Sequence, residues 1–114
     1  QGILSTENLS DFCAIWSHND DMAIGAIEAI KDEGYDPGDD ILIVSVDAIA
    51  DIFLAMMNND TNATVELNPN MGAPALDAIL AYRQGQDIPK WIPVTGVIYF
   101  PEDAEAEYAK RNPE

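Results

Sequence analysis

The apolar run Ile41-Leu42-Ile43-Val44-Ser45-Val46 decides the fold, and it ends at the carboxylate of Asp47. A strand that is apolar at nearly every position is typical of the centre of a parallel sheet, where both faces are covered. Two shorter runs follow the same plan: residues 12–16 lead into Ser17-His18-Asn19, and residues 63–65 lead into Glu66-Leu67-Asn68. Each expected strand therefore ends at side chains that can form hydrogen bonds.

The segments between these strands have the apolar spacing of helices. Residues 20–33 carry apolar side chains at intervals of three and four, at Met22, Ala23, Ala26, Ile27 and Ile30. Asn19 is expected to cap the start of this helix, and Gly34 is expected to end it. Gly25, inside the helix, is expected to let it lie close to a strand.

The rest of the chain continues the alternation of helix and strand. Helices are expected at about 48–57, 73–83 and 102–111, and a last strand is expected at about 94–100. The resulting order, β-α-β-α-β-α-β-α, predicts an open, mostly parallel α/β sheet with flanking helices, of the flavodoxin or Rossmann kind. We expect one domain over residues 1–114, because the sequence shows no repeat and no clear linker.

The composition excludes several classes of partner. The chain has 21 acidic and 5 basic residues, and its net charge of -16 would repel nucleic acid and anionic lipid. It has no apolar run of about 20 residues that could insert into a membrane. The single cysteine, Cys13, falls in an expected strand and is expected to be a buried thiol. The chain begins at Gln1, which suggests that it has been processed or cut.

The ends of the expected strands form a candidate binding site, because parallel sheets bind ligands beyond the carboxyl ends of their strands. Amide and carboxylate groups with almost no cations suit a neutral polyhydroxylated ligand, such as a sugar, better than a phosphate. The carboxylate of Asp47 can accept hydrogen bonds from sugar hydroxyls or cap the next helix, and both can hold through different oxygens. The amide of Asn19 has the same two roles open to it.

Four further residues near the strand ends are candidates of lower rank. Glu66 and Asn68 are expected on the same side of their strand, which can face either ligand or solvent. Trp16 can stack on a sugar ring, or it can pack in the core or against another lobe. His18 is the only histidine in the sequence, which argues against a metal site or a catalytic pair of histidines.

The sequence contains no motif for catalysis or for a cofactor. It lacks the glycine-rich phosphate loops GxGxxG and GxxxxGK followed by Ser or Thr, and it lacks the nucleophile motif GxSxG. We therefore expect no metal, no cofactor and no enzymatic activity. A flavodoxin-like hydrolase that uses Asp47 and His18 stays open as a further class, although the spacing of these residues does not support it.

Three stretches resemble the type I periplasmic sugar-binding proteins of ABC transporters. They are residues 16–27 (WSHNDDMAIGAI), residues 43–47 (IVSVD) and residues 63–69 (ATVELNP). The segment 51–57 (DIFLAMM), followed by 65–71 (VELNPNM), is most similar to the galactofuranose-binding members. The resemblance covers about residues 12–110 in one order and with similar spacing.

The resemblance implies a receptor that binds a monosaccharide, furanose or pyranose, in the bacterial periplasm and presents it to an ABC transporter permease. It also implies that the residues matched by Asn19 and Asp47 hydrogen-bond the sugar from the carboxyl-terminal lobe. Leu67 stands where ribose- and glucose-binding members carry an amide, so that contact is not expected here. The chain would be part of the carboxyl-terminal lobe, without the other side of the pocket.

The same resemblance leaves one surface without its usual partner. In the family, the helix matched by residues 73–83 packs on the other lobe, so its apolar stripe of Leu76, Ile79 and Leu80 must fold back on the sheet, bind a second copy or stay exposed. We expect self-association as a homo-oligomer. The alternative class is the effector-binding core of a LacI-type transcription regulator, which shares the fold.

Overall fold

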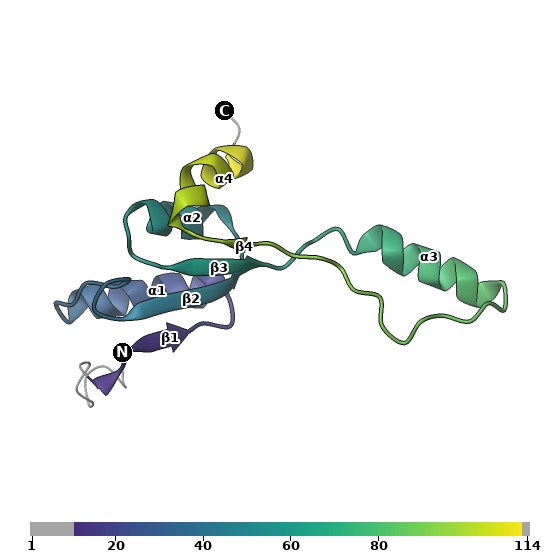
Figure 1. Cartoon of the computed structure of the whole chain (residues 1–114), viewed down its shortest axis with the longest axis horizontal. Helices are drawn as coiled ribbons and strands as arrows, with labels where there is room; N and C mark the ends of the chain where they lie inside the picture. The colour runs from purple at the N-terminus through teal and green to yellow at the C-terminus, as the bar shows by residue number, and fades with distance from the viewer. Residues whose placement is uncertain (1–10, 113–114) are drawn as a thin grey trace.

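Four strands form one sheet in the order β1-β2-β3-β4, in a computed structural model that describes residues 11–112. The strands are β1 (Ala14–Trp16), β2 (Leu42–Asp47), β3 (Ala63–Glu66) and β4 (Ile98–Tyr99). The first three are parallel, and β4 is antiparallel to β3. The helices are α1 (Asp20–Asp32), α2 (Ala50–Met57), α3 (Gly72–Arg83) and α4 (Ala104–Arg111), with a short 3-10 helix, η2 (Pro101–Asp103), before α4. The open, mostly parallel α/β sheet predicted from the sequence is confirmed (Figure 1).

A single apolar core joins α1, α2 and α4 to one face of the sheet. Ile30 of α1, Ile43 of β2 and Phe53 of α2 are fully buried in it. The helix α4 adds Ala104, whose small side chain is also completely buried. Removal of these apolar surfaces from water is the main force that assembles the three helices on this side of the sheet.

The other face of the sheet is uncovered in the part of the chain that the structure describes. Leu42 is 51% exposed, although its neighbour Ile43 is fully buried. Trp16, Val65 and Ile98 are also exposed on the strands around it. The prediction that β2 is buried on both faces is therefore wrong, because no element within residues 11–112 packs on this second face.

The strand β1 lies at the edge of the sheet and is shorter than predicted. It spans Ala14–Trp16 instead of 12–16, and Phe12 is exposed. Cys13 is exposed as well, so the prediction of a buried thiol is wrong. The physical reason is that an edge strand with only one covered face leaves much of its surface in solvent.

The two ends of α1 agree with the sequence. The side chain of Asn19 accepts a hydrogen bond from Met22 N at 2.8 Å, which confirms the predicted cap. Gly34 follows the end of the helix with a φ of 83°, a conformation that glycine adopts without strain. A Cβ placed on Gly25 would meet no atom within 4 Å, so the prediction that Gly25 brings α1 close to a strand is wrong.

The helix α3 lies far from the sheet on a projecting arm, which we define as residues 68–97 (Figure 1). No residue of α3 is buried, and its apolar stripe of Leu76, Ile79 and Leu80 is about half exposed. Of the three outcomes expected for this stripe, folding back on the sheet does not occur, and association with a second copy stays a prediction. The radius of gyration is accordingly 18.3 Å, against about 13 Å for a compact chain of this length.

Two segments run side by side where the arm joins the sheet. Glu66 N donates a hydrogen bond to Val97 O at 2.7 Å, and Asn68 Nδ2 donates to Thr95 O at 2.9 Å. Residues 94–97 of the strand predicted at 94–100 therefore belong to the segment of the arm that returns to the sheet, and only the two residues of β4 pair with β3. The direction of β4 is antiparallel because the chain returns along β3 from the arm.

Gly96 lies in the returning segment of the arm, against the backbone of Glu66 at the end of β3. A Cβ at this position would lie 2.3 Å from Glu66 O, far inside van der Waals contact. We expect Gly96→Ala to lower the free energy of unfolding by about 1–3 kcal/mol, as at other overpacked positions. Urea unfolding followed by circular dichroism measures this change. The matched control is Gly72→Ala, because a Cβ on Gly72 meets nothing within 4 Å. Equal costs at the two glycines would contradict the argument.

Candidate functional site

Three of the predicted ligand residues lie at one edge of the sheet, at or just beyond the carboxyl ends of β1, β2 and β3. Trp16 pairs with Val44 across the first two strands. Asn19 comes three residues after Trp16, in the turn before α1, and Asp47 comes three residues after Val44, as the last residue of β2. Both therefore lie at the same edge. Asp47 in turn pairs with Glu66 of β3. The order across this edge is therefore Asn19, Asp47, Glu66.

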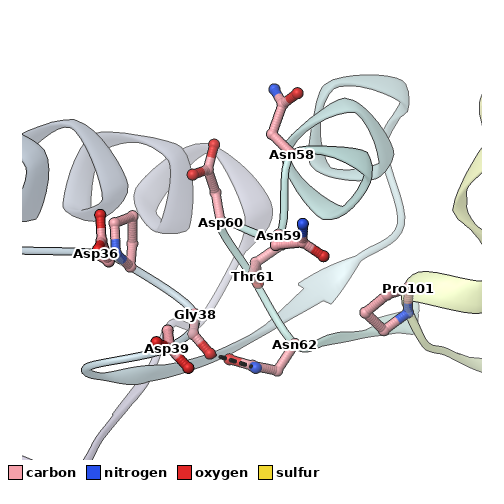
Figure 2. Close-up of a pocket in the computed structure, with 10 residues that line it drawn as sticks. Asp36, Gly38, Asp39, Asn58, Asn59, Asp60, Thr61, Asn62 and Pro101 are labelled. Atoms are coloured by element: carbon pink, nitrogen blue, oxygen red, sulfur yellow. Dashed lines mark hydrogen bonds between the residues drawn. The ribbon is translucent and has the colours of Figure 1, made fainter.

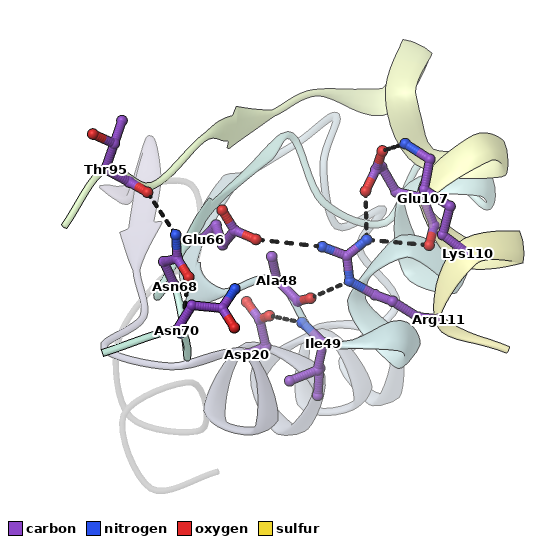
Figure 3. A network of polar contacts seen from close by, with 10 residues as sticks. All are labelled: Asp20, Ala48, Ile49, Glu66, Asn68, Asn70, Thr95, Glu107, Lys110 and Arg111. Carbon is purple, nitrogen blue, oxygen red and sulfur yellow. Dashed lines mark hydrogen bonds and ion pairs between the residues drawn. The ribbon is translucent and has the colours of Figure 1, made fainter. Parts of the chain in front are cut away.

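Asp20 is a fully buried carboxylate that ties this edge together. Its Oδ1 accepts hydrogen bonds from Ser45 Oγ at 2.5 Å and from Thr64 Oγ1 at 2.8 Å. Its Oδ2 accepts a hydrogen bond from Ile49 N at 2.8 Å (Figure 3). One side chain therefore fixes the start of α1 against β2, β3 and the turn between β2 and α2.

The sequence indicates Asp20 only as an acid in the first turn of a helix, so this role was missed. A signal was present in Ser45 and Thr64, which are hydroxyl residues in strands that are otherwise mostly apolar. Because buried hydroxyl groups need hydrogen-bond partners, two of them on adjacent strands indicate a shared polar partner. The sequence does not say which residue that partner is.

Asp47 and Ala48 have backbone conformations that are rare for residues with a side chain. Their φ angles are 127° and 64°, in the region that favours glycine. The N-cap of α2 is Ile49, without a side-chain hydrogen bond, so the interpretation of Asp47 as the cap of this helix is wrong. Asp47 is half-buried, and its carboxylate makes no hydrogen bond to another residue within 11–112. Its role as an acceptor for sugar hydroxyls stays a prediction.

Asn19 uses one end of its amide as the cap of α1. Its Oδ1 accepts the hydrogen bond from Met22 N, while its Nδ2 makes no hydrogen bond within the described part of the chain. The amide nitrogen can therefore donate to a ligand oxygen without disturbing the cap. Of the two roles left open by the sequence, capping is confirmed and ligand binding stays a prediction.

Arg111 reaches the same edge from the end of α4 (Figure 3). Its Nε donates a hydrogen bond to Ala48 O at 2.8 Å, and its Nη2 lies 4.0 Å from Glu66 Oε1. Its guanidinium also lies over the ring of Phe53, 4.6 Å from the ring centroid. No local pattern in the sequence indicates these contacts, because 63 positions separate Arg111 from Ala48.

Glu107 holds the guanidinium of Arg111 in place. Arg111 Nη1 donates to Glu107 Oε2 at 2.5 Å, and Lys110 donates to the other carboxylate oxygen. The hydrogen bond from Lys110, followed by that from Arg111, lowers the pKa of the Glu107 carboxyl, although burial opposes the shift. The bond to Glu107 also raises the pKa of Lys110. Glu107 is therefore charged at neutral pH and can keep Arg111 oriented.

Asn68 and Glu66 have different surroundings, although the sequence places them on the same side of a strand. Asn68 donates through Nδ2 to Thr95 O, and its Oδ1 accepts from Asn70 N at 2.9 Å, so both ends of its amide are used at the base of the arm. Glu66 is half-buried close to Arg111. A ligand contact by either residue stays a prediction.

The aromatic candidate Trp16 lies at the end of β1 with its side chain mostly in solvent. It is 71% exposed, and the neighbouring His18 is exposed as well. Trp16 is therefore not part of the core formed by residues 11–112. Its other two roles, stacking on a sugar ring and packing against a second lobe, stay predictions.

A polar cavity of about 490 Å³ lies at the opposite edge of the sheet, near the amino ends of β2 and β3 (Figure 2). Several of its lining groups already have partners. Asp60 accepts a hydrogen bond from Lys31 Nζ at 2.7 Å, and Asn62 Nδ2 donates to Gly38 O at 2.8 Å. These groups stabilise the turns around the cavity, and none of them belongs to the predicted ligand edge.

Within residues 11–112, no group of three or more His, Cys, Asp or Glu side chains is placed to hold a metal ion. No helix in this range has the length and hydropathy needed to cross a membrane.

The chain is similar to curated receptors for sugars. It is 44% identical over 110 residues to the galactofuranose-binding protein YtfQ of Escherichia coli K12, a match that covers 96% of this chain and 35% of that protein. It is 33% identical over 97 residues to the ribose import binding protein RbsB of Bacillus subtilis 168, covering 81% of this chain and 30% of that protein. No protein-family model matches the chain.

Solved structures give the same result. The periplasmic component of the arabinose ABC transporter from Shewanella sp. ANA-3, bound to α- and β-L-arabinofuranose, is 58% identical with a TM-score of 0.78, and the match covers 87% of this chain and 33% of that chain. A protein from Mycobacterium smegmatis in complex with β-D-fucofuranose is 31% identical with a TM-score of 0.79, covering 96% of this chain and 36% of that chain.

Fold and relatives together define the family, because the relatives that this chain matches over most of its length are sugar-binding proteins. The chain belongs to the type I periplasmic sugar-binding proteins, and it spans about a third of the length of the relatives that it matches. The resemblance found in the sequence, including the likeness to galactofuranose-binding members, is confirmed. Because these relatives are transport receptors, the alternative of a LacI-type regulator is not favoured.

Proposed function

We propose that this chain supplies one side of a monosaccharide-binding site in a periplasmic receptor for an ABC transporter. The observation that carries this proposal is the pair of Asn19 and Asp47 at the carboxyl edge of the parallel strands, each with a polar group that has no partner within residues 11–112. Relatives bound to arabinofuranose and fucofuranose support a furanose as the ligand. Glu66, Asn68 and Trp16 are secondary candidates for contact with it.

Asn19 and Asp47 have complementary hydrogen-bonding roles. The carboxylate of Asp47 accepts hydrogen bonds from ligand hydroxyls, and Asn19 Nδ2 donates to a ligand oxygen. A neutral sugar is not repelled by a chain with a net charge of -16, whereas a phosphorylated sugar would be. The activity is binding without catalysis: the receptor shifts from an open to a closed state, and no covalent bond changes.

In this proposal, the other side of the pocket is formed by a second lobe, and the permease is a separate partner of the whole receptor. We infer that residues 11–112 form part of a carboxyl-terminal lobe. A second lobe and the docking surface for the permease correspond to the parts of the relatives that this chain does not match. The exposed arm supports this arrangement, because its apolar side chains have no partner within the described residues. The extracytoplasmic location rests on the periplasmic relatives.

The substitution Asp47→Ala tests the proposed site. We expect it to weaken sugar binding by about 2–4 kcal/mol, because a charged hydrogen-bond acceptor is lost from a closed pocket. The measurement is titration calorimetry with L-arabinose and D-galactose, on a receptor in which this chain replaces the matching third of the Shewanella relative. Asp21→Ala is the control, because it removes the same charge from an exposed position on α1. Unchanged affinity in Asp47→Ala would remove Asp47 from the site.

Without a second lobe, we propose that the chain associates with a second copy through its arm. Residues 68–97 contain two acidic and two basic residues, so the arm has no net charge although the whole chain carries -16. Charge repulsion therefore does not oppose contact between two arms. Light scattering at micromolar concentration should give the mass of a dimer or a larger oligomer, and Leu76→Glu with Leu80→Glu should restore the monomer. A monomeric mass for the unchanged chain would refute this proposal.

A further inference from the structure

The turn at Asp47 and Ala48 combines backbone strain with support from distant residues. Two consecutive residues with side chains have positive φ angles, 127° and 64°, although glycine would adopt them more easily. Conformations of this kind persist only where the surroundings hold them, and they cluster at ligand sites. Ala48 is 5% exposed and belongs to the apolar core, which explains why glycine is not the better residue there.

Three contacts hold this turn. On its amino-terminal side, Asp47 pairs with Glu66 of β3. On its carboxyl-terminal side, Asp20 Oδ2 accepts the hydrogen bond from Ile49 N at 2.8 Å. Between them, Arg111 Nε donates to the carbonyl of Ala48 at 2.8 Å. The only one of these contacts that comes from outside the sheet and α1 is that of Arg111, on α4.

Arg111 is well suited to fix a carbonyl in a defined position. Its guanidinium is planar, so its donors have a fixed geometry. An ion pair to the carboxylate of Glu107 and a hydrogen bond to the backbone carbonyl of the same residue orient it. The rings of Phe53 and Tyr99 lie against it, with centroids at 4.6 Å and 5.4 Å. Its side chain is only 23% exposed. A group held on so many sides can resist the tendency of the strained turn to relax.

We propose that Arg111 is a positioning residue for the sugar site: through the carbonyl of Ala48, it holds Asp47 in the backbone conformation in which its carboxylate meets the ligand. The inference rests on the proposed function of Asp47. According to this inference, α4 affects sugar affinity through the backbone of Ala48 and without touching the sugar.

The first test measures the turn itself, in the unmodified chain and in two variants. Arg111→Met keeps an unbranched side chain against the rings of Phe53 and Tyr99 but loses the hydrogen-bond donors. Lys110→Met is the control: it removes the same charge from a residue that also contacts Glu107 but does not reach Ala48. The ¹³C shifts and the HN–Hα coupling of Ala48 report the sign of φ. We expect them to move in Arg111→Met only. Identical spectra for the two variants would overturn the inference, and Arg111→Lys replaces Arg111→Met if the latter does not fold.

The second test measures sugar affinity, in the receptor that carries this chain in place of the matching third of the Shewanella relative. We expect Arg111→Met to weaken L-arabinose binding about ten-fold, and Lys110→Met to leave it unchanged. Adding Ala48→Gly should restore much of the loss, because glycine adopts the positive φ without help, and a loss due only to poorer packing would not be rescued. Unchanged affinity in Arg111→Met, or no rescue by Ala48→Gly, would overturn the inference.

The two proposals fail in different ways. If Asp47→Ala leaves affinity unchanged, the sugar site itself is wrong, whatever the spectra of Ala48 show. If Asp47→Ala weakens binding and Arg111→Met does not, the site stands and the positioning role of Arg111 is wrong.

Discussion

The substitution Asp20→Ala should lower the free energy of unfolding by about 3–5 kcal/mol, because it leaves two buried donors and one half-buried donor without an acceptor. These donors are Ser45 Oγ, Thr64 Oγ1 and Ile49 N, which all reach the one carboxylate. The loss is a large part of the about 5–15 kcal/mol that stabilises a typical domain. We therefore expect the variant to be partly unfolded even without denaturant.

Urea unfolding, followed by circular dichroism, measures the cost of Asp20→Ala. The control is Asp21→Ala, which removes an exposed acid from the same first turn of α1 and should cost well under 1 kcal/mol by its effect on the helix dipole alone. A cost for Asp20→Ala close to that of the control would show that the buried carboxylate does not hold the strands together.

The substitution Phe53→Ala should have an effect of similar size, about 3–5 kcal/mol, because it empties the centre of the core. Phe53 is fully buried on α2, and its ring packs edge-on against Tyr99 at a centroid distance of 5.3 Å. Its face also carries the guanidinium of Arg111. The variant therefore loses apolar burial, an aromatic pair and a cation–π contact at once.

The same unfolding experiment measures the cost of Phe53→Ala. Leu54→Ala is the matched control, because it truncates the next residue of α2, which is 44% exposed. We expect the control to cost less than half as much. If both truncations cost the same, α2 does not pack on the sheet through Phe53.

The sequence predicted the elements that depend on local patterns. The helix α1 is an example: its cap at Asn19 and its end near Gly34 are both confirmed, because the residues that determine them lie within the helix or next to it. The position of the strand β2 was also predicted to within one residue, at 41–46 against Leu42–Asp47, but its burial was not. Burial depends on what covers the second face, and nothing within residues 11–112 does so.

The candidate site was predicted less completely than the fold. Asn19, Asp47 and Glu66 could be placed on one edge because each follows a strand of a parallel sheet. Asp20 and Arg111 could not be recognised, because their roles arise from partners 25 to 63 positions away. The positive φ angles of Asp47 and Ala48 were also unpredictable, since neither residue type requires them.

The base of the arm has a mechanical consequence for a receptor built around this chain. The arm begins two residues after Glu66, the last residue of β3, which pairs with Asp47 of the neighbouring strand. A rotation of the arm about its base therefore has its axis within one strand spacing of the ligand edge. Because α3 lies far from this axis in a molecule 60 Å long, a rotation of the arm moves the tip of α3 much farther than it moves Asp47. A receptor of this design could swing widely between its two states and keep the geometry of its carboxylate constant.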